Sequence, residues 1–157
     1  MNILVIGQCT LHWGRMEFGN IGNYYIIEPF FRELRRVFPA SKIRTTFQMS
    51  DRFCKDESVS TLSMELYYGW SGNDLERARE EVGLAEQHKV NGGLSKTTPY
   101  IDELLWADLV VDFSGDIWGD NADFLGADRF EVGLLKNKAA QLLGKKTVML
   151  AGSPGPF

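Results

Sequence analysis

The feature that most constrains this chain is a run of consecutive hydrophobic residues, Ile3-Leu4-Val5-Ile6, which ends at Gly7. A strand that is apolar at every position, rather than at every second one, is typical of a parallel sheet covered on both faces. Further short runs follow at 42–47, 109–111 and 146–150. We therefore expect at least four parallel strands, separated by helices.

The first connecting helix is expected from Tyr24 to about Phe38. Hydrophobic residues recur at every fourth position from Ile26, while charged residues occupy the opposite side. Pro29 leaves two alternatives open, because it either kinks the second turn or lies in the first turn of a helix that starts later.

Three more helices are expected, over 73–87, 98–106 and 128–143. Asp128 is the predicted cap of the last one, and Gly144 ends it. Strands alternating with helices predict an α/β fold, a Rossmann-like parallel sheet with helices on both faces, formed by one domain over 1–157.

The segment 48–71 has no clear period. Its alternation of Leu62, Met64 and Leu66 favours a short strand. The charged run Glu76–Glu81, with its interleaved arginines, is interpreted as a solvated helix face.

Composition excludes several classes of function. The 157 residues carry a net charge of −4, which disfavours broad nucleic-acid binding. No stretch approaches the roughly 20 apolar residues of a transmembrane helix. Cys9 and Cys54 form no metal-binding pattern and are interpreted as reduced thiols of a cytoplasmic protein.

Three loops rich in glycine and polar residues leave the carboxyl ends of predicted strands, at 7–23, 114–121 and 152–156. Ligands of open parallel sheets bind at that edge. The convergence of the three loops is the main argument from the residues for a binding site.

The first loop ends in a cluster of small residues before the predicted helix, with Gly19, Asn20, Gly22 and Asn23. Glycines allow close approach of a ligand, and free N–H groups at a helix start favour an anion. A tight turn with an asparagine cap is the alternative. The spacing is not G-x-G-x-x-G and no Walker lysine is present, so ordinary dinucleotide or ATP binding is unsupported.

The loop after the third predicted strand holds Ser114, Gly115, Asp116, Asp120 and Asn121. Short carboxylate and amide side chains suit sugar hydroxyls, and one carboxylate could act as a general base. Turn-forming residues are the alternative. Two aspartates in one short loop favour the functional interpretation.

The first loop also contains His12, a candidate acid, base or anion contact, and Arg15, a candidate anion contact. Exposed, solvated side chains are the alternative for both. Trp13 and Trp118 could form sugar-stacking faces, although aromatic residues are more often core. For Cys9, burial is favoured over a nucleophilic role.

Three elements together resemble the polysaccharide pyruvyl transferase family. Gly19-Asn20-Ile21-Gly22-Asn23 resembles its G-N-x-G-D element, and Gly152–Phe157 resembles its G-Q-x-x-G-P-F loop. Ala107–Val111 leading into Ser114-Gly115-Asp116 is similar to a third element. The segment 48–100 carries no such likeness.

The resemblance implies a GT-B-like enzyme of two Rossmann-like halves that moves the enolpyruvyl group of phosphoenolpyruvate onto a sugar of a surface glycan. Phosphoenolpyruvate is the donor substrate, and no cofactor or metal is implied. This chain corresponds to the acceptor-side first half. We therefore expect a second domain that supplies the phosphoenolpyruvate contacts, and little activity from the first half alone.

Two departures from the family pattern bear on the site. Asn23 stands where aspartate is usual, so a base role there is in doubt, and Asp116 replaces a glycine of an S-G-G-G type loop. The alternatives are one half of a GT-B-type nucleotide-sugar glycosyltransferase and a non-catalytic glycan-binding module.

Overall fold

The computed structural model describes residues 1–7, 21–113 and 128–150. Their strands form one five-stranded, all-parallel sheet in the order β3-β2-β1-β4-β5. The bounds are β1 Asn2–Ile6, β2 Lys42–Thr45, β3 Val59–Thr61, β4 Leu109–Asp112 and β5 Lys146–Met149. This confirms the predicted α/β fold with a Rossmann-like sheet.

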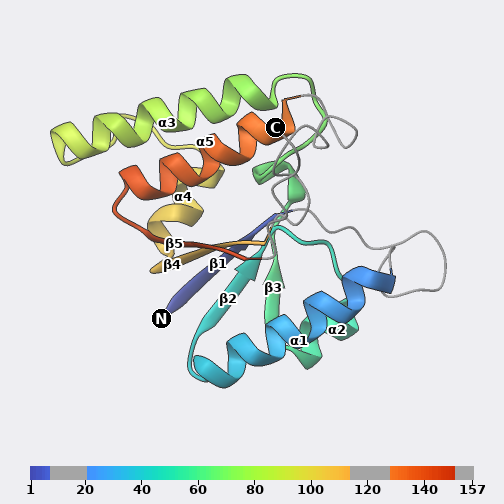
Figure 1. Cartoon of the computed structure of the whole chain (residues 1–157). Helices are drawn as coiled ribbons and strands as arrows, with labels where there is room; N and C mark the ends of the chain where they lie inside the picture. The colour runs from blue at the N-terminus through green and yellow to red at the C-terminus, as the bar shows by residue number, and fades with distance from the viewer. Residues whose placement is uncertain (8–20, 114–127, 151–157) are drawn as a thin grey trace.

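The helices lie on both faces of the sheet (Figure 1). α1 (Ile21–Val37) and α2 (Asp51–Asp56) lie on one face, and α3 (Asp74–Asn91), α4 (Pro99–Trp106) and α5 (Arg129–Leu142) on the other. This division follows from the strand order, because right-handed crossovers that leave β1 in opposite directions place their helices on opposite faces.

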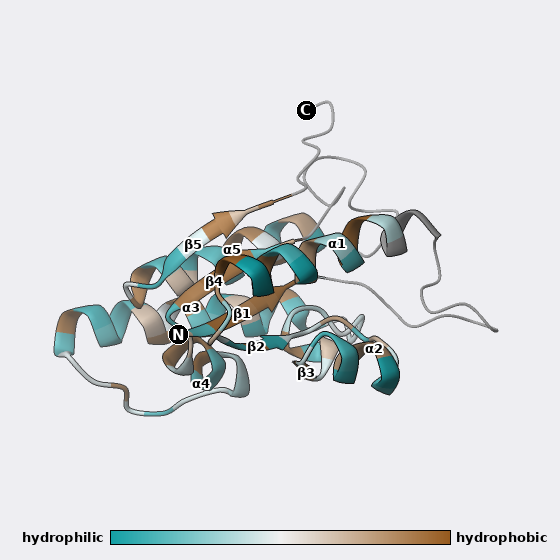
Figure 2. Cartoon of the chain, turned by 90° about the horizontal axis from the view of Figure 1, so that it is seen from below, coloured by the Kyte–Doolittle hydropathy of each residue, from teal (hydrophilic) through white to brown (hydrophobic). Residues whose placement is uncertain are grey.

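The central strand β1 explains why its sequence is hydrophobic at every position. Ile3 and Val5 pack into the core beneath α1, whereas Leu4 and Ile6 pack into the core beneath α3, α4 and α5. Both pairs are fully buried. Figure 2 shows the hydrophobic colouring concentrated on the strands between the two helix layers. One short strand therefore holds two cores together.

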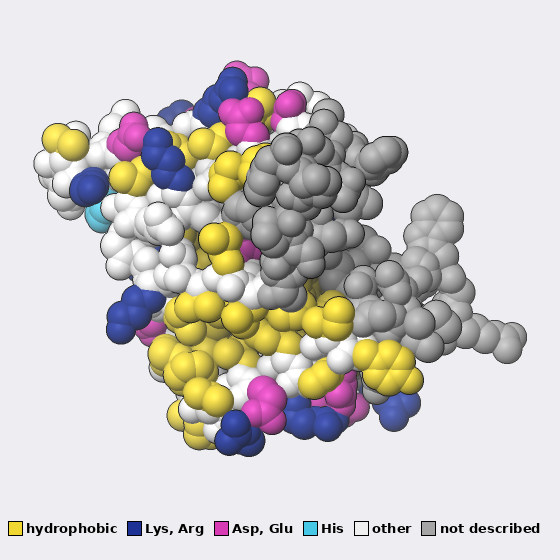
Figure 3. Space-filling view, in the orientation of Figure 1, with side chains coloured by type: hydrophobic (Ala, Val, Ile, Leu, Met, Phe, Trp, Pro, Cys, Tyr) yellow, Lys and Arg dark blue, Asp and Glu magenta, His cyan; other side chains and the backbone are white. Residues whose placement is uncertain are grey.

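The outer strand β5 is less covered than β1. Val148 pairs in register with Val111 on the same side of the sheet as α1, and remains 42% exposed. Figure 3 shows hydrophobic side chains gathered between the strands and α1 on the face turned to the viewer.

α1 begins three residues before the predicted Tyr24, at Ile21, and contains Pro29 in its interior. The alternative of a later start at Pro29 is therefore wrong. Because proline has no N–H, the helix lacks one backbone hydrogen bond at that turn.

The strand predicted at Leu62–Leu66 is wrong. Residues Met64–Leu66 form a 3-10 turn, η1, and the third strand in chain order is β3, just before it. Only Val59 of β3 is buried, whereas Ser60 and Thr61 are exposed, so this edge strand has no hydrophobic pattern to recognise. The short α2 was also not predicted.

Two helix ends follow local capping rules. The hydroxyl of Thr98 accepts the N–H of Ile101 at 3.2 Å at the start of α4, as predicted. α3 runs four residues beyond the predicted Gln87 and ends at Gly92, which has a φ of 71°. Among the described helices, none is long and apolar enough to cross a bilayer.

Candidate functional site

Gly7, directly after β1, is packed closely between the residues that follow β2 and β4. Gly7 has a φ of +146°, and a Cβ there would lie 2.8 Å from the Phe113 carbonyl oxygen and 2.9 Å from the Phe47 ring. The Gly7 N–H donates to Thr46 Oγ1 at 3.1 Å, and that hydroxyl donates to the Gly7 carbonyl at 2.8 Å. A larger residue would push the strand ends apart.

The close packing at Gly7 fixes the strand ends from which the three loops predicted to bind a ligand begin. Segment 8–20 follows Gly7, segment 114–127 follows Phe113, and segment 151–157 follows Leu150. The Phe113 N–H donates to the Ile6 carbonyl at 2.8 Å, and the Leu150 N–H donates to the Asp112 carbonyl at 2.8 Å. All three segments therefore start from neighbouring points at the carboxyl edge of the sheet. This is the edge at β1 and β4, the two strands between which the strand order reverses.

Most of the predicted site residues lie outside the described part of the chain: His12, Arg15, Gly19, Asn20, Ser114, Gly115, Asp116, Asp120 and Asn121. Cys9, Trp13 and Trp118 lie outside it as well. Gly22 and Asn23 fall in the first turn of α1, so the small-residue cluster overlaps the helix start instead of preceding it. The roles assigned to all of these residues stay predictions.

Asp112 is the last residue of β4. It is 1% exposed, and its carboxylate is bound by the side-chain amide of Asn137 on α5. Asn137 also donates to the Gly133 carbonyl at 3.0 Å. Because the buried carboxylate is bound by a side chain of α5, it joins β4 to that helix.

The prediction that Glu76–Glu81 forms a solvated face is wrong at its last residue. Glu81 is buried against α5, where the ammonium of Lys136 lies 2.6 Å from its carboxylate. The Lys136 ammonium also lies 4.1 Å from the centre of the Tyr100 ring. A lysine 55 positions along the chain, on a helix that packs against α3, is not visible as a partner in the sequence.

Burial dominates the electrostatics of this pair. It raises the pKa of Glu81, although the Lys136 charge works against the shift. It lowers the pKa of Lys136, against the attraction of Glu81. Burial and the nearby charges of Glu81 and Asp112 also raise the pKa of Tyr100 well above its ordinary value. These groups connect α3, α4 and α5 in the interior.

The turn before α3 is organised by one carboxylate. Asp74 accepts the N–H of Gly69 at 2.9 Å and the N–H of Ser71 at 3.0 Å, and it pairs with the Arg77 guanidinium. Burial by itself would raise the pKa of Asp74, but these donors outweigh burial and hold that pKa below its ordinary value. Asp74 therefore stays ionised at neutral pH and fixes the residues on either side of Trp70.

Asp128 occupies the N-cap position of α5, as predicted, but makes no side-chain capping bond. Its φ of 59° lies in the left-handed region. The exposed carboxylate is therefore not used by the helix it precedes.

Sequence reasoning passed over Trp70 and its turn. The available signal is the stretch Trp70-Ser71-Gly72-Asn73-Asp74, where an aromatic residue stands directly beside turn-forming residues. A core tryptophan is seldom placed in such a setting.

Within residues 1–7, 21–113 and 128–150, no three His, Cys, Asp or Glu side chains gather closely enough to hold a metal ion. The described residues offer a closely packed glycine at the carboxyl end of β1 and the exposed carboxylate of Asp128 before α5. Comparison of the chain with protein-family models, with curated proteins and with solved structures gave no match.

Proposed function

We propose that the chain is the N-terminal, acceptor-side domain of a polysaccharide pyruvyl transferase. The enzyme would move the enolpyruvyl group of phosphoenolpyruvate onto a sugar of a surface glycan. The observation that carries the proposal is the common starting edge of segments 8–20, 114–127 and 151–157, because these contain the elements that resemble the family. Elements far apart in the sequence can serve one site only if they start close together.

In the proposed reaction, an acceptor hydroxyl adds to the enol carbon of phosphoenolpyruvate while a general acid protonates its methylene carbon. The bond from that carbon to the phosphate oxygen then breaks and the methyl group gives up a proton, so that inorganic phosphate leaves and the enolpyruvyl group stays on the sugar oxygen. Asn20, Asp116 and Asp120 position the acceptor, and either aspartate could take the hydroxyl proton. His12 is the further candidate acid or base. Positioning and charge stabilisation in a closed cleft supply most of the rate gain.

The donor belongs to a second domain in this proposal. Phosphoenolpyruvate carries a carboxylate and a phosphate, and the net charge of −4 makes this chain a poor holder of such an anion. Arg15 and the first turn of α1, with Gly22 and Asn23, are the anion contacts that this chain could add. No cofactor is required, and a cytoplasmic location would suit both the donor and the reduced thiols.

The test is phosphate release from phosphoenolpyruvate by the full-length enzyme in the presence of an acceptor glycan. Asp116→Ala should lower kcat/KM by about 100-fold or more if Asp116 acts as the base. Asp56→Ala, at an exposed carboxylate on α2, is the matched control and should leave turnover unchanged. Unchanged turnover in Asp116→Ala would remove that residue from the site.

Other outcomes separate the competing functions. Dependence on a nucleoside diphosphate sugar, with no use of phosphoenolpyruvate, would favour a glycosyltransferase of similar architecture. Glycan binding without turnover of either donor would favour a non-catalytic module. In an NMR titration of this chain, sugar should shift the amides of 19–23 and 114–121, and phosphoenolpyruvate should have little effect.

A further inference from the structure

Trp70 is an exposed aromatic residue in an unfavourable backbone conformation. Its side chain lies on the surface, with the residue 50% exposed, and its φ is +50°. A bulky L-residue in the left-handed region costs free energy that glycine would avoid. The residue keeps this conformation although half of it remains exposed to solvent.

The conformation of Trp70 is held from both sides. The N–H groups of its neighbours Gly69 and Ser71 both donate to Asp74, and Ser71 Oγ donates to Asn73 Oδ1 at 2.6 Å. The turn is therefore fixed before any ligand arrives, which lowers the ordering cost of binding.

The ring of Tyr68 supports the indole. The two ring centres lie 5.4 Å apart with an angle of 85° between the planes, an edge-to-face contact. Tyr68 is almost fully buried, so it anchors Trp70 to the core beneath α3. The exposed ring is consequently a rigid platform.

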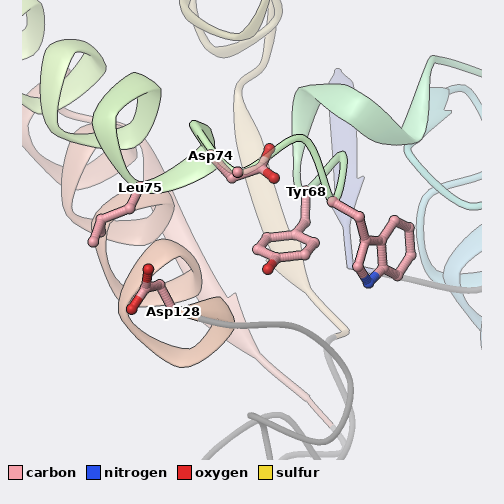
Figure 4. Close-up of a pocket in the computed structure, with 6 residues that line it drawn as sticks. Tyr68, Asp74, Leu75 and Asp128 are labelled. Atoms are coloured by element: carbon pink, nitrogen blue, oxygen red, sulfur yellow. The ribbon is translucent and has the colours of Figure 1, made fainter.

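A hollow of about 220 Å³ lies beside this platform. Its described lining consists of Tyr68, Trp70, Gly72, Asp74, Leu75 and Asp128. Figure 4 shows Tyr68 and Asp74 on one side, with Leu75 and Asp128 across from them at the starts of α3 and α5. Sites for drug-sized ligands run from about 300 to 1,000 Å³, so this hollow fits a smaller unit.

The charged side chains among the described lining residues of the hollow are both carboxylates. Two carboxylates, Asp74 and Asp128, are among its described lining residues, whereas no lysine or arginine is. Asp74 is already occupied by two N–H groups and by Arg77, which leaves Asp128 as the available acceptor. Asp128 would repel a phosphate or carboxylate, whereas hydroxyl groups could donate to it.

We propose that this hollow binds a single pyranose ring of a neutral sugar. The C–H face of the ring stacks on Trp70, whose aromatic face is electronegative, and Leu75 offers a further apolar contact. A ring hydroxyl donates to Asp128. Only the role of the hollow, which is to hold one unit of the acceptor glycan, rests on the proposed function.

The location of the hollow suits that role. α3 follows β3 and α5 follows β4 in the chain, so the starts of both helices lie toward the carboxyl edge of the sheet. A glycan held there by one ring reaches toward the segments that begin after Gly7 and Phe113.

The test is a titration of the chain, followed by amide NMR and tryptophan fluorescence, with methyl glycosides of glucose, galactose and mannose and with N-acetylglucosamine. At least one should give saturable shifts centred on residues 68–75 and 128. Trp70→Ala should weaken that binding about tenfold. Asp128→Asn should weaken it several-fold, while the matched control Asp56→Asn should not. Circular dichroism establishes that each variant is folded.

Other ligands in the same titration can overturn the proposal. Choline tests whether the aromatic and acidic lining takes a cation instead, and phosphoenolpyruvate tests for an anion. Saturable binding of choline or phosphoenolpyruvate at residues 68–75, with no response to any sugar, would be evidence against a sugar site. The absence of amide shifts and fluorescence changes with every sugar would be equal evidence against it. If a sugar binds here but the full-length enzyme releases no phosphate from phosphoenolpyruvate, the proposed function fails and the sugar site stands.

Discussion

Two carboxylates on one face of α3 behave in opposite ways. Asp74 and Glu81 lie two helical turns apart, each is 5% exposed, and each has a cationic partner. Yet the pKa of Asp74 is lowered and that of Glu81 is raised. The difference lies in the number of donors, since Asp74 receives two backbone N–H groups besides its guanidinium, whereas Glu81 sits deeper and depends mainly on Lys136.

The comparison shows that an ion pair does not by itself decide whether the pKa of a buried carboxylate is raised or lowered. At the surface end of α3, hydrogen bonds outweigh burial, and the carboxylate organises a turn. In the interior, burial outweighs a single close cation. The two sites should therefore respond differently when their partners are removed.

The largest effect is expected at the interior pair. Lys136→Met leaves the Glu81 carboxylate buried without its partner and should lower the free energy of unfolding by about 3–5 kcal/mol, measured by urea denaturation. Lys138→Met is the matched control on the same helix, because its ion pair with Glu86 is exposed. That control should change stability by less than about 1 kcal/mol.

A double variant tests the cause. Adding Glu81→Leu to Lys136→Met removes the unpaired charge and should recover most of the lost stability. If the double variant is as unstable as the single one, the loss of stability comes from packing. The unpaired charge of Glu81 would then not be its cause.

A smaller effect is expected at the turn. Asp74→Asn replaces charge-assisted hydrogen bonds to Gly69 and Ser71 with weaker ones and should cost about 2 kcal/mol in unfolding free energy. The amide shifts of residues 69–71 should move most. Asp56→Asn should stay within about 0.5 kcal/mol, and an equal loss in both variants would contradict a special role for Asp74.

The pH dependence of stability tests the lowered pKa of Asp74 at the start of α3. Because the pKa of Asp74 is lower in the folded chain than its ordinary value of 3.8, its stabilisation is complete above that value. It is lost as the pH falls from there through the folded pKa. Unfolding free energy measured from pH 6 to pH 2 should therefore fall less steeply in Asp74→Asn than in the unchanged chain. Parallel curves would contradict the lowered pKa.

The smallest effect is expected at Trp70. Trp70→Gly loses the contact with Tyr68 but relieves the left-handed backbone, so the net change should be below about 1 kcal/mol. Trp70→Ala keeps the strain and should be about 1 kcal/mol less stable than Trp70→Gly by urea denaturation. At Leu134, on the exposed side of α5, the order should reverse, with alanine more stable than glycine. The same order at both positions would show that φ at residue 70 costs nothing.

The sequence predicted the parts of the fold that are specified locally. Ile3–Ile6 is apolar throughout because β1 has two cores to fill, and Thr98-Pro99 begins α4 through its own cap. β3 was misplaced because it buries only Val59. Glu81 was misinterpreted because its environment comes from Lys136, on a distant part of the chain.

The candidate site was predictable to a lesser degree. The strand order brings Gly7, Phe113 and Leu150, the residues that precede segments 8–20, 114–127 and 151–157, to one edge of the sheet. The Trp70 platform depends on a backbone conformation and on two N–H bonds to Asp74. Neither has a periodic signature in the sequence, so both are visible only in the three-dimensional structure.

The contact at Gly7 has a consequence for how this chain could diversify. With 2.8 Å between an added Cβ and the Phe113 oxygen, no side chain fits, and the positive φ excludes most of them a second time. A library randomised at position 7 and selected for folding should return glycine almost alone. New ligand preferences would then have to arise in the segments that follow the strands, while the strand ends beneath them stay the same.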